Sequence, residues 1–272
     1  MGAQDKGLRR LMKDALRLVY PPQCLRCGEP VAEEGSLCPA CWGEARFISG
    51  HCCVLCGAPL PGEDPEDEDG AGAALPWPAL AGQGAWGPGG EIPCDDCLAR
   101  PRPWQRGRAA LVYRGAGREL ALMLKHGDRP DLAPALGDWV GRAAEAIVRP
   151  GMVVVPVPLH LRRLARRKYN QAALLSHRVA RMHGLTHLPG ALVRLRHTPM
   201  QDHGSVADRH ANVADAIGPA PRLRARLKGR EVLLVDDVMA SGATLAAAAG
   251  ALAEAGAGPI SVVVLARAVK DP

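Results

Sequence analysis

The sequence predicts an α/β protein in which a parallel sheet, covered by helices on both faces, follows a small cysteine-rich module. From residue 106 onward, runs of Val, Ile and Leu alternate with helical patterns, and such runs are typical of parallel strands buried on both faces. Between residues 23 and 105 the composition changes to Cys, Gly and Pro, with little periodic apolar pattern. We therefore divide the chain into a helix at residues 1–22, the cysteine-rich module at residues 23–105 and the α/β domain at residues 106–272.

The composition excludes several classes of protein. A chain of 272 residues is long enough to bury a hydrophobic core, which excludes a peptide hormone or a knottin. No apolar run approaches the roughly 18 residues that a membrane span needs. The N-terminus lacks the order of a signal peptide, so we expect a cytoplasmic protein whose nine cysteines bind metal rather than form disulfides.

The charge distribution is uneven along the chain. The formal net charge is +6, but six of the 28 acidic residues lie between Gly62 and Gly70, so the remainder of the chain is strongly basic. This excess of Arg fits a phosphate-bearing ligand or a nucleic acid, and it fits genomic base composition equally well.

The first 22 residues carry a helical pattern. Apolar residues recur at helical spacing from Leu8 to Val19, and Pro21 and Pro22 end the pattern. The result is a short amphipathic helix whose basic face either docks on its own domain, the commoner case, or contacts an anionic surface.

Eight of the nine cysteines form four C-x-x-C pairs. They are Cys24 and Cys27, Cys38 and Cys41, Cys53 and Cys56, and Cys94 and Cys97. The segment CLRCGEPV resembles CVLCGAPL, and in each the residue after the second Cys is a Gly, which suits the tight turn of a zinc knuckle. We therefore assign one structural Zn²⁺ to the first two pairs and a second Zn²⁺ to the last two.

Other uses of the cysteines stay open. Disulfides, a redox C-x-x-C or interleaved ligand sets would also use these pairs. Cys52, the ninth cysteine, and His51 lie next to Cys53 and compete with it as ligands. Within the module, residues 61–93 form an acidic and then Gly/Ala/Pro-rich tract that we interpret as a disordered insert.

The α/β domain is predicted element by element. We expect strands at residues 108–113, 152–157, 231–235 and 259–267, and helices at residues 116–127, 170–184 and 242–256. Residues 197–221 are predicted to be rich in loops.

The most informative segment is VLLVDDVMASGATL, at residues 232–245. A buried strand delivers Asp236 and Asp237 to its carboxyl end, where ligands bind in open α/β sheets. Backbone N–H groups and hydroxyls at the start of the next helix can bind a phosphate, and the two carboxylates can accept protons from vicinal hydroxyls of a sugar. A sugar 5-phosphate fits this arrangement, although an acidic strand end followed by an ordinary helix cap is the plainer alternative.

This segment resembles the phosphoribosyl pyrophosphate (PRPP) motif of type I phosphoribosyltransferases. The whole chain resembles the ComF family, in which a double zinc ribbon precedes such a domain. Three further stretches carry the resemblance: VPVPLH at residues 155–160, RRLARRKYNQ at residues 162–171 and TPMQDHGSVADRHAN at residues 198–212.

The resemblance implies a role for each matching position. Asp236 and Asp237, the catalytic pair, would hold the ribose hydroxyls. The 5-phosphate would bind Val238, Met239, Ala240, Ser241, Gly242, Ala243 and Thr244. Pyrophosphate would face Pro158, Leu159 and His160, residues 198–212 would form a mobile loop over the site, and Mg²⁺ would accompany PRPP.

Some features near these motifs depart from the family pattern, and others have a role that stays open. Ala240 and Ser241 stand where many members have two Thr, Lys168 stands where Gly is common, and residues 201–203 are unusual. The basic stretch at residues 162–168 binds either pyrophosphate or a polynucleotide, or is simply solvated. Lys125 and His126 end a helix that can reach the site, or they are ordinary partners of the helix dipole.

Two functions follow from the resemblance. The first is phosphoribosyl transfer from PRPP to an unknown acceptor, linked to DNA uptake in natural transformation. The alternative is a non-catalytic, PRPP-responsive protein that binds single-stranded DNA and works with DNA-uptake proteins, and a zinc-stapled scaffold is a third, plainer option.

Overall fold

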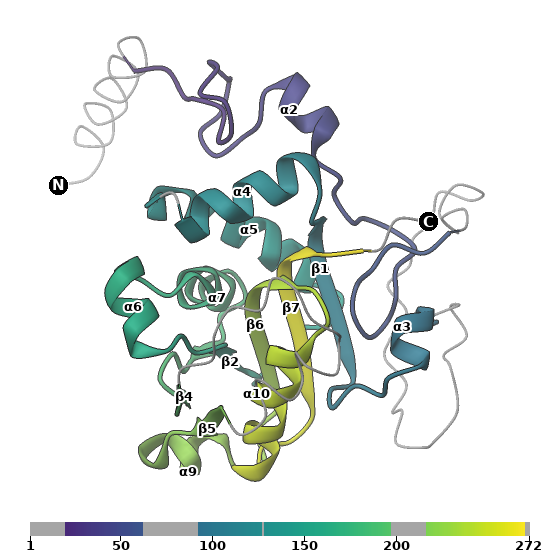
Figure 1. Cartoon of the computed structure of the whole chain (residues 1–272), viewed down its shortest axis with the longest axis vertical. Helices are drawn as coiled ribbons and strands as arrows, with labels where there is room; N and C mark the ends of the chain where they lie inside the picture. Colours follow the sequence, from purple (N-terminus) through teal and green to yellow (C-terminus); the bar gives the residue numbers. More distant parts are fainter. Residues whose placement is uncertain (1–19, 62–91, 127, 197–215, 270–272) are drawn as a thin grey trace, which may run out of the picture.

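The computed structural model describes residues 20–61, 92–126, 128–196 and 216–269 (Figure 1). Its centre is a five-stranded sheet with the order β1-β7-β6-β2-β3, in which every neighbouring pair is parallel. The strands are β1 (Arg106–Val112), β2 (Val153–Pro156), β3 (Thr186–His187), β6 (Val232–Met239) and β7 (Ile260–Arg267). The parallel sheet expected from the apolar runs is therefore confirmed.

Three helices cover one face of the sheet. They are α4 (Gly115–His126), α5 (Ala133–Ala144) and α7 (Gln171–Met182), with the short η2 (Pro130–Leu132) before α5. Leu120, Leu136 and Leu175 point from these helices into a continuous core and are completely buried. Burial of such leucines stabilises the fold by about 2 kcal/mol each.

Helix α5 was not predicted from the sequence. Its two glycines, Gly137 and Gly141, weaken the helical signal. A Cβ at Gly137 would lie 2.6 Å from the Cβ of Arg178 on α7, so the close approach of the two helices requires Gly there. Packing against the neighbouring helix therefore overrides propensity.

The opposite face is covered by α10 (Ala243–Glu254) and by the antiparallel pair β4 (Leu192–Arg194) and β5 (Ile217–Pro219). Ala248 and Ala249 of α10 are completely buried, because small side chains bring this helix close to the sheet. The remaining elements are α6 (Leu161–Arg167), which follows β2, and η3 (Pro221–Leu223) and α9 (Arg224–Leu227), which follow β5.

The cysteine-rich segments cover the β1 edge of the sheet. The first ribbon (residues 20–45, with α2 at Pro39–Glu44) packs on α4, and the second ribbon (residues 50–61 and 92–102, with α3 at Asp95–Leu98) lies beside β1 (Figure 1). Between them, Ile48 N–H donates to the Ala110 carbonyl of β1 at 3.0 Å. The edge strand is thereby protected from pairing with another chain.

Several expectations fall partly or wholly on residues that the structure does not describe, which are 1–19, 62–91, 127, 197–215 and 270–272. They are the helix at residues 1–22, the insert at residues 61–93 and the loop at residues 198–212. Among the described residues, no helix is long and apolar enough to cross a membrane.

Candidate functional site

The two acids expected at the site lie near the end of β6. This strand continues to Met239, four residues beyond the expected end, so Asp236 and Asp237 belong to the strand itself. Successive side chains of a strand point to opposite faces. The pair, which we call the dyad, therefore straddles β6, and the Asp237 N–H donates to Asp236 Oδ1 at 2.9 Å.

Cationic side chains approach the dyad from both sides of the sheet. On the α4 side, Lys125 Nζ lies 3.3 Å from Asp237 Oδ2. On the other side, Arg194 of β4 interacts electrostatically with Asp236. Burial, together with the charge of Arg163 on α6, lowers the pKa of Arg194. Of the two alternatives that the sequence leaves for Lys125, the structure shows the one in which it reaches the site, whereas the sequence gives no indication of Arg194.

The surroundings of the dyad disfavour ionisation of Asp236. Burial raises the pKa of Asp236 to about 7, and the neighbouring Asp237 carboxylate adds to the increase. The charges of Lys125 and Arg194 oppose this shift without cancelling it. At neutral pH Asp236 therefore retains part of its proton, which a ligand or a cation can displace.

Lys125 is held in place by the segment that leads into α7. The hydroxyl of Tyr169 donates to the Leu124 carbonyl at 2.8 Å, and Gln171 Nε2 donates to the same carbonyl at 3.4 Å. Both residues belong to the RRLARRKYNQ stretch, so these motif residues fix the end of α4 next to the dyad.

The turn after β6 connects the dyad to α10. Gly242 is the N-cap residue and has a φ of +82°, a left-handed conformation that suits Gly. The Ala243 N–H lies 3.4 Å from Ser241 Oγ, which caps the start of the helix. The N-terminus of α10, with its partial positive charge, therefore opens beside the dyad, as an anion site requires.

A second loop ends at the same edge of the sheet. Strands β2 and β6 are neighbours in parallel register, so the loop at Pro158, Leu159 and His160 follows β2 beside the turn after β6. Asn170 Nδ2 donates to the Val157 carbonyl at 3.0 Å and holds this loop. His160 Nδ1 accepts from the Arg162 N–H at 3.2 Å and caps α6. All of the described residues predicted for the site are thus at one sheet edge.

The eight predicted zinc ligands form two groups of four sulfurs. One contains Cys24, Cys27, Cys38 and Cys41, and the other contains Cys53, Cys56, Cys94 and Cys97. A tetrahedral ion with Zn–S bonds of about 2.3 Å separates its sulfurs by about 3.8 Å. The Cys27–Cys38 and Cys56–Cys94 sulfur distances are 3.7 Å and 3.6 Å, so both groups fit structural zinc sites.

The knuckle geometry agrees with the internal repeat. Gly28 and Gly57 each follow the second Cys of a pair and have φ of +79° and +66°. Cys52 is outside both sulfur groups among the described residues, and its backbone forms a bridge with Pro59, as Gln23 does with Pro30 in the first knuckle.

Two arginines that were not predicted for the site lie between the second sulfur group and the turn after β6. Arg102 lies in the second ribbon, and Arg267 ends β7 with only 3% of its surface exposed. The sequence held one signal for Arg267, since it is the single charged residue at the end of the apolar run PISVVVLAR.

Comparison with known protein families assigns both parts of the chain. Residues 15–72 match the double zinc ribbon domain family, and residues 184–271 match the phosphoribosyl transferase domain family.

Several curated proteins are similar to this chain. DNA utilization protein YhgH of Salmonella typhi is 32% identical over 182 residues, which cover 65% of this chain and 78% of that protein. The Escherichia coli protein of the same name has the same identity and coverage. Competence protein F of Haemophilus influenzae is 38% identical over 115 residues, which cover 42% of this chain and 50% of that protein.

Among solved structures, the chain is similar to a glutamine PRPP amidotransferase from B. subtilis in complex with ADP and GMP. The identity is 21% and the TM-score 0.37, over 53% of this chain and 30% of the amidotransferase. The chain therefore spans less than a third of that enzyme.

Proposed function

The chain belongs to the ComF family, and we propose that it binds PRPP at the edge of the sheet formed by β6 and β2 and transfers the phosphoribosyl group to an acceptor during the handling of DNA. The observation that carries this proposal is the dyad beside the left-handed turn at the start of α10. The dyad supplies acceptors for two ribose hydroxyls, and the helix N-terminus supplies donors for a 5-phosphate.

Each neighbouring group has a task in this proposal. The loop at Pro158, Leu159 and His160 would face the pyrophosphate. Mg²⁺, when bound with PRPP, would neutralise the charge of the departing pyrophosphate. Asp236 would release its proton as the dyad accepts the ribose hydroxyls, and Lys125 would hold Asp237 in position.

The cellular role follows from the curated relatives, whose names refer to DNA utilization and competence. We place the protein in the cytoplasm, since two four-cysteine zinc sites need thiolates that an oxidising compartment would convert to disulfides.

A double variant tests this site. Asp236→Asn with Asp237→Asn should abolish PRPP binding in calorimetry, because neither amide accepts a proton from a hydroxyl as strongly as a carboxylate does. The same variant should retain two zinc ions per chain, since the dyad is not part of either sulfur group. Unchanged PRPP affinity would contradict the assignment. Release of pyrophosphate in the presence of an acceptor would separate catalysis from binding.

A second candidate function is PRPP-responsive binding of single-stranded DNA. A cleft of about 1090 Å³ lies between the first ribbon and α5, and aromatic rings line it. Trp42, which is 57% exposed, packs on Phe47, with 4.6 Å between the ring centroids. Phe47 packs in turn on Trp139, with 5.0 Å between the centroids. Bases stack on such rings in proteins that bind single strands.

The charges in this cleft are mixed. Arg129 and Arg142 line it, but so do Glu33, Glu34 and Asp138. Binding there would depend on stacking more than on charge, so Trp42→Ala should weaken the binding of an oligothymidylate at least fivefold while the salt dependence changes little. Equal affinity of Trp42→Ala and the unmodified protein would exclude this cleft.

A further inference from the structure

Arg102 connects the second sulfur group to the turn after β6. Its Nε lies 3.4 Å from Cys97 Sγ, and its Nη1 donates to the Ser241 carbonyl at 2.7 Å. The guanidinium also lies over the ring of Trp104, 5.6 Å from the centroid. One planar group therefore contacts a zinc ligand and the turn at the same time, and an aromatic ring limits its movement.

Arg267 makes a parallel connection from β7. Its Nη1 donates to the Ala240 carbonyl at 2.8 Å and contacts the Met239 carbonyl at 3.3 Å. The same guanidinium interacts electrostatically with Cys56 of the second sulfur group. Three successive carbonyls, those of residues 239–241, are thus bound by two arginines. Arg102 contacts a sulfur of the second group, and Arg267 interacts electrostatically with another.

These contacts determine where the N–H groups of the turn point. In a trans peptide the N–H lies opposite the carbonyl of the same unit. When the carbonyls of residues 239–241 point toward the arginines, the N–H groups of residues 240–242 point away from the second sulfur group. Those N–H groups are donors for an anion at the start of α10.

The charges of the two groups complement each other. Four thiolates exceed the charge of one Zn²⁺ ion by two negative charges, and the two guanidiniums supply two positive charges. Arg267 is almost fully buried, so its charge needs an anionic partner, and the second sulfur group lies on its side of the turn. Loss of the zinc removes the bonds that hold the four sulfurs together, and with them the fixed partner on which Arg102 is placed. The two arginines are then no longer held in the geometry that orients the turn.

We propose that Arg102 and Arg267 are positioning residues through which the second zinc site, but not the first, orders the turn that binds the 5-phosphate of PRPP. The inference rests on the proposed function for its ligand, and on the contacts of the two arginines for its mechanism. It makes zinc occupancy at the second site a condition for tight PRPP binding.

The first zinc site provides an internal comparison. Arg26 Nη1 lies 3.8 Å from Cys41 Sγ, but this arginine pairs with Glu44 and with Glu119 of α4, each at 2.6 Å. These contacts lead to α4 rather than to the turn after β6. Removal of the first zinc should therefore leave the turn unchanged.

Zinc release tests the coupling between the two sites. The variant Cys27→Ser removes the first zinc and leaves the second, whereas Cys94→Ser removes the second without altering a thiol that contacts an arginine. Because coupling between sites is reciprocal, saturating ribose 5-phosphate should slow release of the second zinc to a chelator about fivefold or more in Cys27→Ser. It should not affect release of the first zinc in Cys94→Ser. In a protein that binds ribose 5-phosphate, equal effects on both sites, or none on the second, would overturn the inference.

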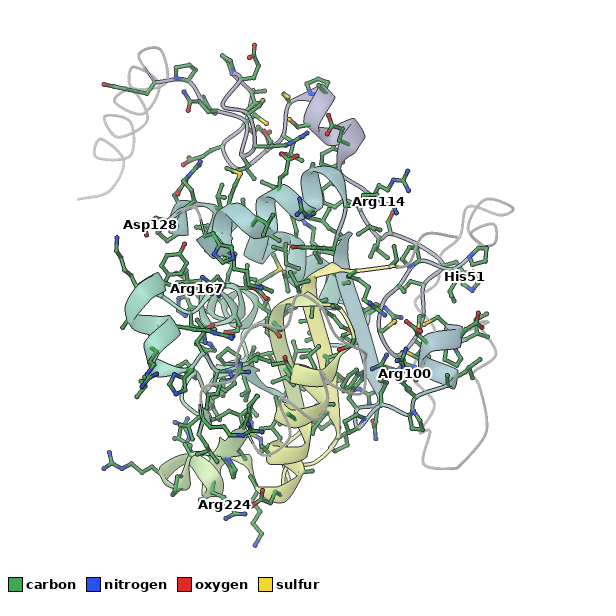
Figure 2. All side chains as sticks on the ribbon, viewed as in Figure 1. His51, Arg100, Arg114, Asp128, Arg167 and Arg224 are labelled. Atoms are coloured by element: carbon green, nitrogen blue, oxygen red, sulfur yellow. The ribbon has the colours of Figure 1, made fainter. Side chains whose placement is uncertain are left out.

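Substitution of an arginine tests the pathway. Arg102→Gln should reduce the effect of ribose 5-phosphate on release of the second zinc to less than half, whereas Arg100→Gln should not change it. Arg100 lies beside α3 in the same ribbon (Figure 2) and donates to Asp96 at 2.7 Å rather than to the turn. A purely structural role of Arg102 would lower stability while preserving this ligand effect, and that result would also overturn the inference.

Hydrogen exchange separates this inference from the proposed function. Amides of residues 240–242 should exchange at least fivefold faster in Cys94→Ser than in Cys27→Ser, with no ligand present. Faster exchange in a protein that binds neither PRPP nor ribose 5-phosphate would refute the proposed function and support the coupling. Equal exchange in the two variants of a protein that binds PRPP would refute the coupling alone.

Discussion

Replacement of Asp236 by Asn should stabilise the protein while it weakens PRPP binding. Burial and the Asp237 carboxylate raise the pKa of Asp236 from 3.8 to about 7. Between these pH values the folded chain holds a proton that the unfolded chain has released, so the free energy of unfolding falls as the pH rises. Asn cannot ionise, and its Oδ1 can still accept the hydrogen bond from the Asp237 N–H.

The size of the gain follows from the same pKa. A change from 3.8 to about 7 corresponds to about 4 kcal/mol at about 1.4 kcal/mol per pH unit. The Asp236 side chain is partly open to solvent, so we expect about half of this, about 2 kcal/mol at pH 8. For a protein of this size the melting temperature should rise by about 4–8 °C.

Thermal unfolding of zinc-loaded protein at pH 5 and pH 8 checks this prediction. The gain of Asp236→Asn should be largest at pH 8 and less than half as large at pH 5, where Asp236 is already protonated. Asp131→Asn is a control of opposite sign, because the hydrogen bond from exposed Arg129 lowers the pKa of Asp131 and the variant loses that contact. An Asp236→Asn variant that is less stable than the unmodified protein at pH 8 would refute the reasoning.

Three further substitutions have expected outcomes. Gly242→Ala should cost about 1–2 kcal/mol in thermal unfolding, because Gly242 has a φ of +82° and the added Cβ would lie 2.8 Å from Arg102. The same variant should weaken PRPP binding, and unchanged PRPP affinity would argue that the turn does not bind the ligand. Gly107→Ala, with a Cβ 2.2 Å from a carbonyl of the second ribbon, should cost about 1–3 kcal/mol, whereas Gly43→Ala should not destabilise. Lys125→Met should raise the pH at which PRPP affinity is half-maximal by about 0.5–1 unit; an unchanged profile would show that the lysine does not tune the dyad.

The parts of the site that depend on local sequence could be predicted. The dyad, the turn and the start of α10 are consecutive in the chain, so a strand, two acids and a glycine specify their arrangement. The zinc ligands were predictable for a similar reason, since the repeat of the knuckle, with a Gly after the second Cys, groups the pairs.

The parts that depend on tertiary contact could not be predicted. Arg102 lies 139 residues from Ser241 in the chain, and no local pattern records their hydrogen bond. Arg194 reaches the dyad because β4 forms an antiparallel pair with β5 on the α10 side of the sheet. Helix α5 was missed because its glycines, which serve its packing on α7, hide its periodicity.

The most direct test of the account is a calorimetric titration of PRPP with Mg²⁺ into the zinc-loaded protein, with ribose 5-phosphate as the comparison. The account predicts saturable binding of both ligands at one site, with PRPP bound more tightly because its pyrophosphate contacts the loop at Pro158, Leu159 and His160. Absence of binding by either ligand would contradict it, and it would direct the search for function to the zinc ribbons and the aromatic cleft.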